Sequence, residues 1–354
     1  MRTSCSTTLG KTRHRRSLLS VALASFVWLG CSLPPDPAPS PLFTGATMGT
    51  TYAVTVAATV TEPEASRIHE TIHTTLTEID AAMSTYDERS ELSRFNRSRG
   101  TSWVDVSPDL FRVLRHALDI SDVTDGAFDV TVGPLVNAWG FGPTDRTDAV
   151  PTAEDVEGLL ANVGHTQVHI DPESARLKKE QADIEIDLSA LAKGYGVDRV
   201  AEALDTAGYD SYLIEVGGEV RARGYRLDGR RWRVGIEQPT DGAIGLQRVI
   251  ELRDAALATS GDYRNYFEAA GRRYSHTIDP RTGYPVAHRL ASASVVASEC
   301  VIADALATAL AVLGPDEGYR LADAKGWAAL LVVREEDGRF TERATPAFLA
   351  MTGD

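Results

Sequence analysis

Residues 186–194, with the sequence IDLSALAKG, predict the change from a strand to a helix. We expect the strand to end at Asp187 and the helix to span residues 189–207, because Gly208 follows and glycine is common just after a helix. A strand is expected next at 212–216, then a turn at Gly217-Gly218, and a further strand at 231–236. A helix is therefore flanked by hairpin-like strands.

The same pattern continues on both sides of this stretch. Residues 51–56 have strand character, and residues 65–83 carry apolar side chains at helical spacing. Ser107-Pro108 predicts a helix start, and a helix at 303–313 should end at Gly314-Pro315. Separated helices and hairpins, rather than regular βαβ alternation, predict an α+β fold: one compact domain at 46–350, with mixed or antiparallel sheets and packed helices.

The composition limits the possible partners. The chain has 354 residues, a net charge of -14, 43% hydrophobic residues and 24% charged residues. These proportions indicate a globular body, and the acidic balance argues against nucleic acid as a partner. A phosphate-bearing ligand would need a metal ion, a helix N-terminus or a single lysine to hold it.

The first 45 residues differ from the rest. A basic cluster at 13–16, an apolar run at 18–29 and Gly30-Cys31 predict a signal peptide at 1–30. The Pro-rich segment that follows predicts an extended tether at 31–45. The arrangement resembles a bacterial lipoprotein with a lipid on Cys31. Because Trp28 stands where such signals usually carry Leu, cleavage by ordinary signal peptidase is the alternative. Both routes export the mature chain. Cys300 lies among apolar residues and should be a core residue.

Two elements carry groups suited to an anionic ligand and a metal. Lys193 lies in the first turn of the helix after Asp187, where a cation opposes the helix dipole, so it either binds an anion or is solvated. Asp304 and Thr308 share one face of an apolar helix. Together with a backbone carbonyl they would suit Mg2+, although a capping Asp with a back-bonded Thr is the alternative.

Two further segments, each beside a predicted turn, carry candidate site residues. His276 precedes the turn at 279–283 and is either a proton acceptor or a structural histidine. Phe128 follows the turn at Asp125-Gly126 and either stacks on a planar ring or fills the core. No one of these motifs decides the function by itself.

In this order, the segments resemble the ApbE family of FAD:protein FMN transferases. The resemblance covers about residues 47–314 and rests on Met48-Gly49-Thr50, Ser84-Thr85-Tyr86 and the segments 125–129, 187–194, 216–219, 275–280 and 304–308. It implies a T-fold-related domain. It also implies an FAD site lined by Met48, Tyr86, Ala127, Phe128, Asp129, Asp187, Lys193 and Ile278.

The resemblance further implies a Mg2+ site and a reaction. Asp304, Thr308 and the backbone oxygen of Ala190 would hold the metal, with Ala307 at a neighbouring position that is acidic in some relatives. His276 or Asp279 would act as the base for an attacking hydroxyl. The implied activity is transfer of FMN from FAD to a Thr or Ser hydroxyl, with release of AMP.

The resemblance also implies where the reaction takes place. The implied acceptors are membrane redox proteins with a Thr flavinylation motif, and the implied location is the periplasmic side of a bacterial membrane, anchored at Cys31. Two alternatives stay open: a Mg2+-dependent FAD pyrophosphatase that gives FMN and AMP, and a flavin-binding lipoprotein without turnover.

Overall fold

Alternation of apolar and polar residues builds the first hairpin of the chain. In β2 (Thr50–Val56) the side chains of Tyr52, Val54 and Val56 are buried, as a strand with one covered face requires. β2 pairs with β1 (Leu42–Thr47) through a two-residue turn at Met48 and Gly49, whose φ angles are 47° and 70°. Two successive positive φ angles match the twist of a tight hairpin.

The computed structural model describes residues 40–143, 150–240, 245–262, 265–269 and 271–352. The predicted signal peptide, Cys31 and most of the tether lie outside these residues. β1 begins at Leu42, so sheet structure includes the last four residues of the segment predicted as a tether. Among the described residues, no helix is both long enough and apolar enough to cross a membrane.

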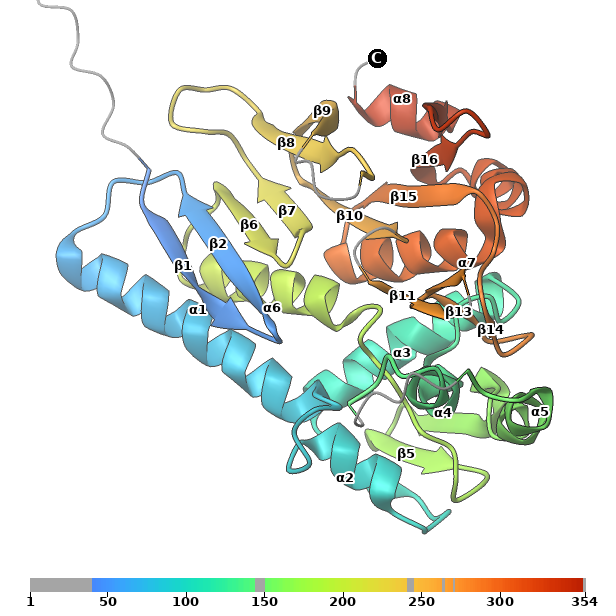
Figure 1. Cartoon of the computed structure of the whole chain (residues 1–354). Helices are drawn as coiled ribbons and strands as arrows, with labels where there is room; N and C mark the ends of the chain where they lie inside the picture. Colours follow the sequence, from blue (N-terminus) through green and yellow to red (C-terminus); the bar gives the residue numbers. More distant parts are fainter. Residues whose placement is uncertain (1–39, 144–149, 241–244, 263–264, 270, 353–354) are drawn as a thin grey trace, which may run out of the picture. The chain divides into compact units, whose positions relative to one another are not determined.

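Within the described chain, the largest sheet has eight strands, and every neighbouring pair is antiparallel (Figure 1). Its order is β1, β2, β6 (Tyr212–Val216), β7 (Glu219–Arg223), β10 (Ala255–Gly261), β15 (Leu290–Ala297), β16 (Ala328–Arg334) and β17 (Phe340–Ala344). The smaller sheets are β3 (Val104–Asp105) with β5 (Arg176–Lys179) and β4 (Val168–Asp171), β8 (Trp232–Glu237) with β9 (Leu246–Leu252), β11 (Tyr266–Ala269) with β12 (Arg272–Ser275), and β13 (Ile278–Asp279) with β14 (Tyr284–Pro285).

Helices cover one face of the large sheet. α1 (Glu62–Met83) packs on α6 (Ala192–Thr206), which packs on α7 (Cys300–Lys325), and all three contact strands of the sheet. The β8–β9 hairpin and α8 (Pro346–Thr352) share a buried cluster with the opposite face. The remaining helices are α2 (Glu91–Arg97), α3 (Pro108–Val123), α4 (Gly133–Ala138) and α5 (Ala153–Leu160), with 3-10 turns at Val130–Val132 and His165–Gln167.

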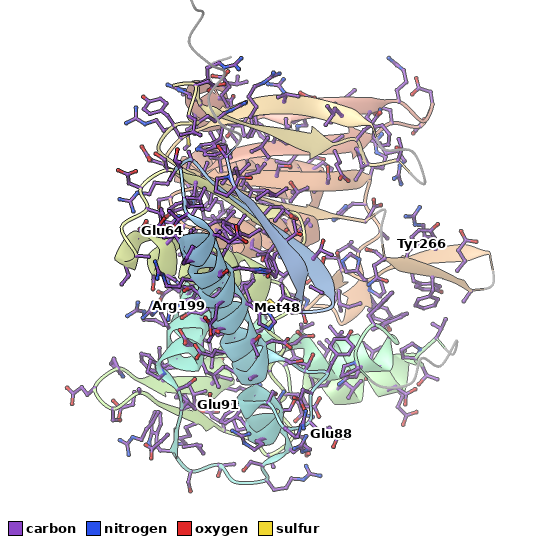
Figure 2. The ribbon with its side chains drawn as sticks, turned by 90° about the vertical axis from the view of Figure 1, so that its left-hand side faces the viewer. Met48, Glu64, Glu88, Glu91, Arg199 and Tyr266 are labelled. Atoms are coloured by element: carbon purple, nitrogen blue, oxygen red, sulfur yellow. The ribbon has the colours of Figure 1, made fainter. Side chains whose placement is uncertain are left out.

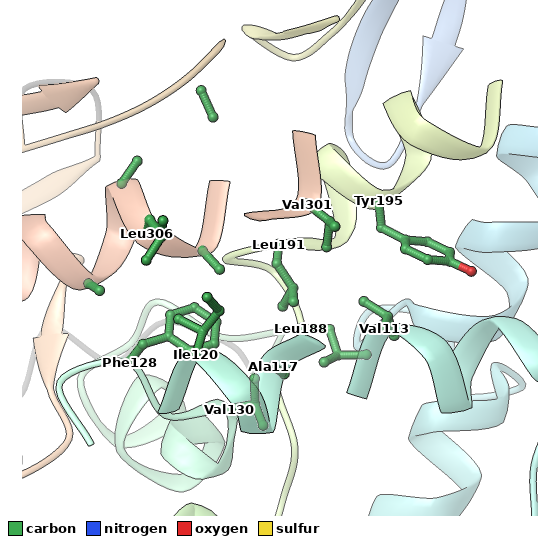
Figure 3. Packing of buried hydrophobic residues seen from close by; sticks show 14 of the residues in the cluster. Val113, Ala117, Ile120, Phe128, Val130, Leu188, Leu191, Tyr195, Val301 and Leu306 are labelled. Atoms are coloured by element: carbon green, nitrogen blue, oxygen red, sulfur yellow. The ribbon is translucent and has the colours of Figure 1, made fainter. Parts of the chain in front are cut away.

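The largest buried cluster joins α3, α7 and the segment that leads into α6. Figure 3 shows Ile120 and Phe128 beside Leu306 of α7, with Leu191 and Leu188 to their right. These five side chains are all nearly or fully buried. Phe128 therefore packs in the core, which is one of its two predicted roles, and this cluster fixes the start of α6 against α7.

The helix and strand predictions are largely confirmed. α1 buries the residues that define the predicted stripe, and α3 begins after Ser107, whose Oγ accepts a hydrogen bond from the amide of Leu110 at 3.2 Å. β2, β6 and β8 lie where strands were predicted. Cys300 is fully buried.

One predicted strand and one predicted helix boundary are wrong. The stretch before Asp187 forms no strand within the described chain, because the side chain of Asn96 makes both hydrogen bonds to the backbone of Ile186, at 2.8 and 2.9 Å. α6 begins at Ala192 rather than at residue 189, after a turn closed by Asp187. The predicted end of a helical segment at Gly314 is confirmed, because the backbone of Gly314 is non-helical, with a φ of 78°. A second helical segment follows within α7 and continues to Lys325.

Candidate functional site

A cavity of about 660 Å³ opens where β7 and β10 of the large sheet stop pairing. β7 pairs with β10 only at residues 255–257, whereas β15 pairs with β10 as far as Gly261. Thr259, Ser260 and Gly261 follow the last residue of β10 that pairs with β7, and they line the cavity. Its volume lies within the range of roughly 300 to 1,000 Å³ that is typical of small-molecule and cofactor sites.

Lys193 projects from the first turn of α6 into this cavity. Its Nζ donates a hydrogen bond to the Glu219 carboxylate and lies 3.7 Å from Oδ2 of Asp304. Burial lowers the pKa of Lys193, but the charges of Asp304 and Glu219 outweigh burial and raise it overall. Burial raises the pKa of both carboxyls, and the lysine opposes this. Lys193 is thus an ion-paired cation and not a solvated one.

Gly217 makes room for the lysine. A Cβ atom on Gly217 would lie 3.0 Å from Cδ of Lys193 and 2.8 Å from Cγ2 of Thr50, and the φ of Gly217 is 60°. Only glycine meets both conditions without strain. The turn between β6 and β7 therefore leaves the space that the Lys193 side chain occupies.

Asp304 comes from α7 and acts on the start of α6. Its Oδ2 accepts a hydrogen bond from the amide of Gly194 at 3.0 Å, so a side chain of one helix caps the other. Asp304 is 2% exposed. A buried carboxylate requires such partners, and here they are an amide and the ammonium of Lys193.

The other predicted metal-site residues divide into two groups. Thr308 and Ala190 line the cavity with Asp304, and Oγ1 of Thr308 is 2.9 Å from Oγ of Ser260. Thr308 is therefore bonded across to β10, not back to its own helix. Ala307 is fully buried in the main core cluster and does not line the cavity.

His276 also lines the cavity, directly after β12. Its Nδ1 lies 2.8 Å from the carbonyl oxygen of Asn265. Because a carbonyl only accepts, Nδ1 carries the proton, and Nε2 of the neutral ring is left as an acceptor. Burial lowers the pKa of His276, and Lys193 lowers it further. Asp279 does not line the cavity; its carboxylate is bonded to the amide and guanidinium of Arg281.

Asp129 and Asp187 hold two further loops that line the cavity. Asp129 accepts from the amide of Thr131 at 2.8 Å, from its hydroxyl at 2.6 Å and from the amide of His165 at 2.6 Å. Asp187 accepts from the amide of Ser189 at 2.8 Å. Both line the cavity, yet several of their oxygen positions are already committed to the protein.

The remaining predicted flavin-site residues are brought together except for one. Tyr86, Ala127, Phe128 and Ile278 line the cavity, and Tyr86 is 69% exposed. Met48 lies at the tip of the β1–β2 hairpin (Figure 2), where its Cε would be 3.2 Å from a Cβ on Gly196. It packs against α6 and is outside the cavity lining.

Glu219 is the functional residue that sequence reasoning left without a role. It is 4% exposed and lines the cavity beside Lys193. The available signal was an acidic residue that directly follows the Gly217-Gly218 turn and begins a strand. Its partner lies 26 positions away, so the pair could not be recognised from local spacing.

The cavity is acidic. Among the described residues that line it, six are Asp or Glu (Asp129, Asp187, Glu215, Glu219, Glu237 and Asp304) and one is a lysine, Lys193. Within the described residues, no group of three or more His, Cys, Asp or Glu side chains could hold a metal ion. The oxygens of Asp304, Thr308 and Ala190 are nevertheless donors of the kind that Mg2+ takes when it keeps water or substrate oxygens as further ligands.

The fold and the site thus define a binding pocket with a neutral histidine at one wall and a lysine–carboxylate cluster at another. The sequence profile of the ApbE family matches residues 48–331. An FAD:protein FMN transferase of Vibrio cholerae is 43% identical over 329 residues, which cover 93% of this chain and 97% of the relative. One of Haemophilus influenzae is 42% identical over 318 residues, covering 87% and 90%.

Solved structures agree with these matches. The flavin transferase ApbE of Vibrio cholerae superposes with a TM-score of 0.81 at 40% identity, covering 89% of this chain and all of the other. The apo form of the flavinyl transferase ApbE of Pseudomonas stutzeri has the same TM-score and identity, covering 90% and 99%. The chain belongs to the ApbE family.

Proposed function

We propose that this protein transfers the FMN part of FAD to a Thr or Ser hydroxyl of another protein and releases AMP. The observation that carries the proposal is the position of His276, with an accepting Nε2, in one cavity with Lys193 and Asp304. Relatives that match nearly the whole chain bear the name of this reaction.

His276 would take the proton of the attacking hydroxyl. The acceptor oxygen forms a bond to the FMN phosphorus, the bond from that phosphorus to the AMP oxygen breaks, and the hydroxyl proton moves to Nε2 of His276. Its hydrogen bond to Asn265 holds the ring and fixes the tautomer. Asp279, the other predicted base, is engaged by Arg281 outside the cavity lining, so His276 is favoured.

Lys193 and a divalent cation would balance the charge of the substrate. A pyrophosphate is anionic, and the described lining of the cavity, with six acidic residues and one lysine, would repel it without a further cation. We assign Mg2+ to Asp304, Thr308 and the carbonyl of Ala190; when bound, it would neutralise charge on the phosphate oxygens. Lys193, held by Glu219, supplies the fixed positive charge of the protein.

The flavin-site assignment groups the predicted residues by what they offer. Tyr86 and Phe128 present aromatic rings, and Ala127 and Ile278 present small or apolar surface to the cavity. Asp129 and Asp187 hold the loops that carry these side chains. Met48 would act through the β1–β2 turn or after a change of rotamer, since it lies outside the cavity lining.

We also propose that the mature chain works at the periplasmic side of a bacterial membrane, anchored by a lipid on Cys31, and that its acceptors are membrane redox proteins. The signal-like residues 1–30 and the Pro-rich segment support this. A Cys31→Ser variant should leave the membrane fraction on cell fractionation. Retention in that fraction would exclude Cys31 as the anchor.

The test of the activity is intact-mass spectrometry of a Thr-bearing acceptor domain after incubation with the protein, FAD and Mg2+. A gain of one FMN, lost on addition of EDTA, supports both transfer and the metal. Free FMN and AMP without a mass gain would point to a pyrophosphatase, in which water replaces the hydroxyl. Intact FAD with no mass gain would contradict both activities and leave a flavin-binding protein.

A further inference from the structure

A second, smaller cavity lies beside the hairpin that leads to His276. Its volume is about 150 Å³, and we call it the aromatic slot. Its lining includes Trp139, Arg273, Tyr274, Tyr284, Val286 and Ala287. None of these residues lines the larger cavity, so the slot is a separate site.

The floor of the slot is built from fixed aromatic rings. Trp139 is 2% exposed, and its Nε1 donates to the carbonyl of Gly283 at 2.8 Å. The rings of Tyr274 and Tyr284 lie 5.4 and 5.8 Å from that of Trp139. Contacts at these separations are favourable aromatic pairs, so the slot has preformed walls.

A continuous series of rings connects the slot with the proposed base. Tyr274 stacks on Phe267 with centroids 5.0 Å apart, and Phe267 contacts Phe141 at 5.5 Å. Phe141 in turn meets His276 edge-on at 6.3 Å. Phe141 and His276 both line the larger cavity. The slot and the larger cavity therefore lie on two sides of one aromatic partition.

The strand β12 also connects them. Tyr274 precedes His276 by two residues, which is about 7 Å along an extended chain. Within the described chain, β11 and β12 pair only with each other, and Figure 2 shows their hairpin, labelled at Tyr266, projecting from the body. An extended segment that follows this hairpin can reach the slot and His276 together.

The chemistry of the slot suits an apolar side chain. The guanidinium of Arg273 lies over the Tyr266 ring at 3.5 Å and donates to the carbonyl of Asp262 at 2.9 Å, so its charge is already engaged. The other walls are mainly aromatic and aliphatic. An engineered cavity of about 150 Å³ in another protein binds benzene, so the slot fits one ring or one branched aliphatic side chain.

We infer that the aromatic slot binds an apolar side chain of the acceptor protein, close in sequence to the hydroxyl residue that reaches His276. This rests on the proposed function. Water needs no such contact, so the slot would favour transfer to protein over hydrolysis. Because a buried apolar side chain contributes to binding, its loss should weaken acceptor binding roughly ten- to a hundredfold.

The test uses the exposed residue Ala287, where a larger side chain fills the slot from outside. Ala287→Trp should raise the KM for the acceptor domain at least tenfold, with kcat at saturating acceptor and the KM for FAD unchanged. Tyr284→Ala, which opens one wall, should also raise the acceptor KM. The matched control is Ala350→Trp, at an exposed position of α8.

A double-mutant cycle keeps the assignment specific. Apolar residues within four positions of the acceptor threonine are replaced by Ala one at a time. One of these replacements should raise the acceptor KM of the wild-type enzyme but cause no further rise in the Ala287→Trp variant. Unchanged acceptor KM in both slot variants overturns the inference. A rise in the KM for FAD instead would assign the slot to the nucleotide. If the wild type transfers nothing, the proposed function itself fails, and the slot assignment with it.

Discussion

Nδ1 of His276 lies 2.8 Å from the carbonyl oxygen of Asn265, on the opposite side of the hairpin that carries the histidine. This contact determines which ring nitrogen holds the proton, and it directs the basic nitrogen away from Asn265. The amide of His276 donates to the same carbonyl at 3.1 Å. The backbone and the ring are thus oriented by one oxygen.

The first prediction concerns this base. His276→Ala should lower the transfer rate by about 100- to 10,000-fold, the usual range for a lost general base, while FAD still binds. Single-turnover transfer and FAD titration measure the two effects. In the wild type, burial keeps the pKa of His276 below 6.5, so the rate should fall only as the pH drops through that lowered value. Unchanged turnover in the variant would remove His276 from the mechanism.

The second prediction concerns the metal. Asp304→Ala removes the one carboxylate among the proposed ligands, so the Mg2+ concentration for half-maximal transfer should rise at least tenfold. Asp316→Ala is the matched control, because Asp316 lies on the same helix with its side chain 84% exposed. A Mg2+ titration of transfer measures both variants. The same titration curve for Asp304→Ala and wild type would refute the metal assignment.

The third prediction concerns stability and pH. His165 lies between Asp129 and Asp122, with its Nδ1 3.4 Å and its Nε2 3.0 Å from their oxygens. The hydrogen bond to Asp129 raises the pKa of His165, against the opposing effect of burial. A raised histidine pKa stabilises the folded state fully below the ordinary value of 6.5, and this stabilisation is lost as the pH rises through the raised value.

His165→Asn should therefore be less stable than the wild type at low pH, and this difference in unfolding free energy should become smaller as the pH increases. Urea denaturation at pH 5.5 and again at pH 9 measures the difference in unfolding free energy between wild type and variant. That difference should be larger at the lower pH. A difference that stays constant across this range would show that His165 acts only as a neutral packing residue.

The sequence predicted those features that depend on local pattern. The apolar residues of α1 recur at helical spacing, and Ser107 precedes Pro108, so both helices could be located. Lys193, Asp304 and Thr308 stood out because polar groups in apolar or dipole-opposing positions are costly. These three residues do meet in one cavity.

The features that were missed depend on partners far along the chain. Ile186 has strand-like neighbours, but its hydrogen-bonding partner is the side chain of Asn96, 90 residues away. Trp139 and Gly283, which meet at the aromatic slot, are 144 residues apart. Since one sequence contains no pairing information, neither the division of the sheet at β7 and β10 nor the slot could be predicted from it.

The last prediction concerns the contact between α6 and α7 that places the lysine–carboxylate cluster. A Cβ atom on Gly194 would lie 2.5 Å from the carbonyl oxygen of Cys300 and 2.9 Å from Cβ of Asp304. Gly194→Ala must therefore push the helices apart, which we expect to destabilise the fold by about 1–3 kcal/mol, as overpacking of a core does. Because the Gly194 amide also donates a hydrogen bond to Asp304, the Mg2+ concentration for half-maximal transfer should rise as well.

Gly158→Ala is the control for Gly194→Ala. Gly158 lies inside α5, and a Cβ atom there would meet nothing within 4 Å. The change should be neutral or stabilise by up to about 1 kcal/mol, because alanine has the higher helix propensity. Thermal denaturation of both variants, followed by a Mg2+ titration of transfer, measures the two effects. If Gly194→Ala were as stable as Gly158→Ala, the close approach of α6 to α7 would not be what positions Asp304 beside Lys193.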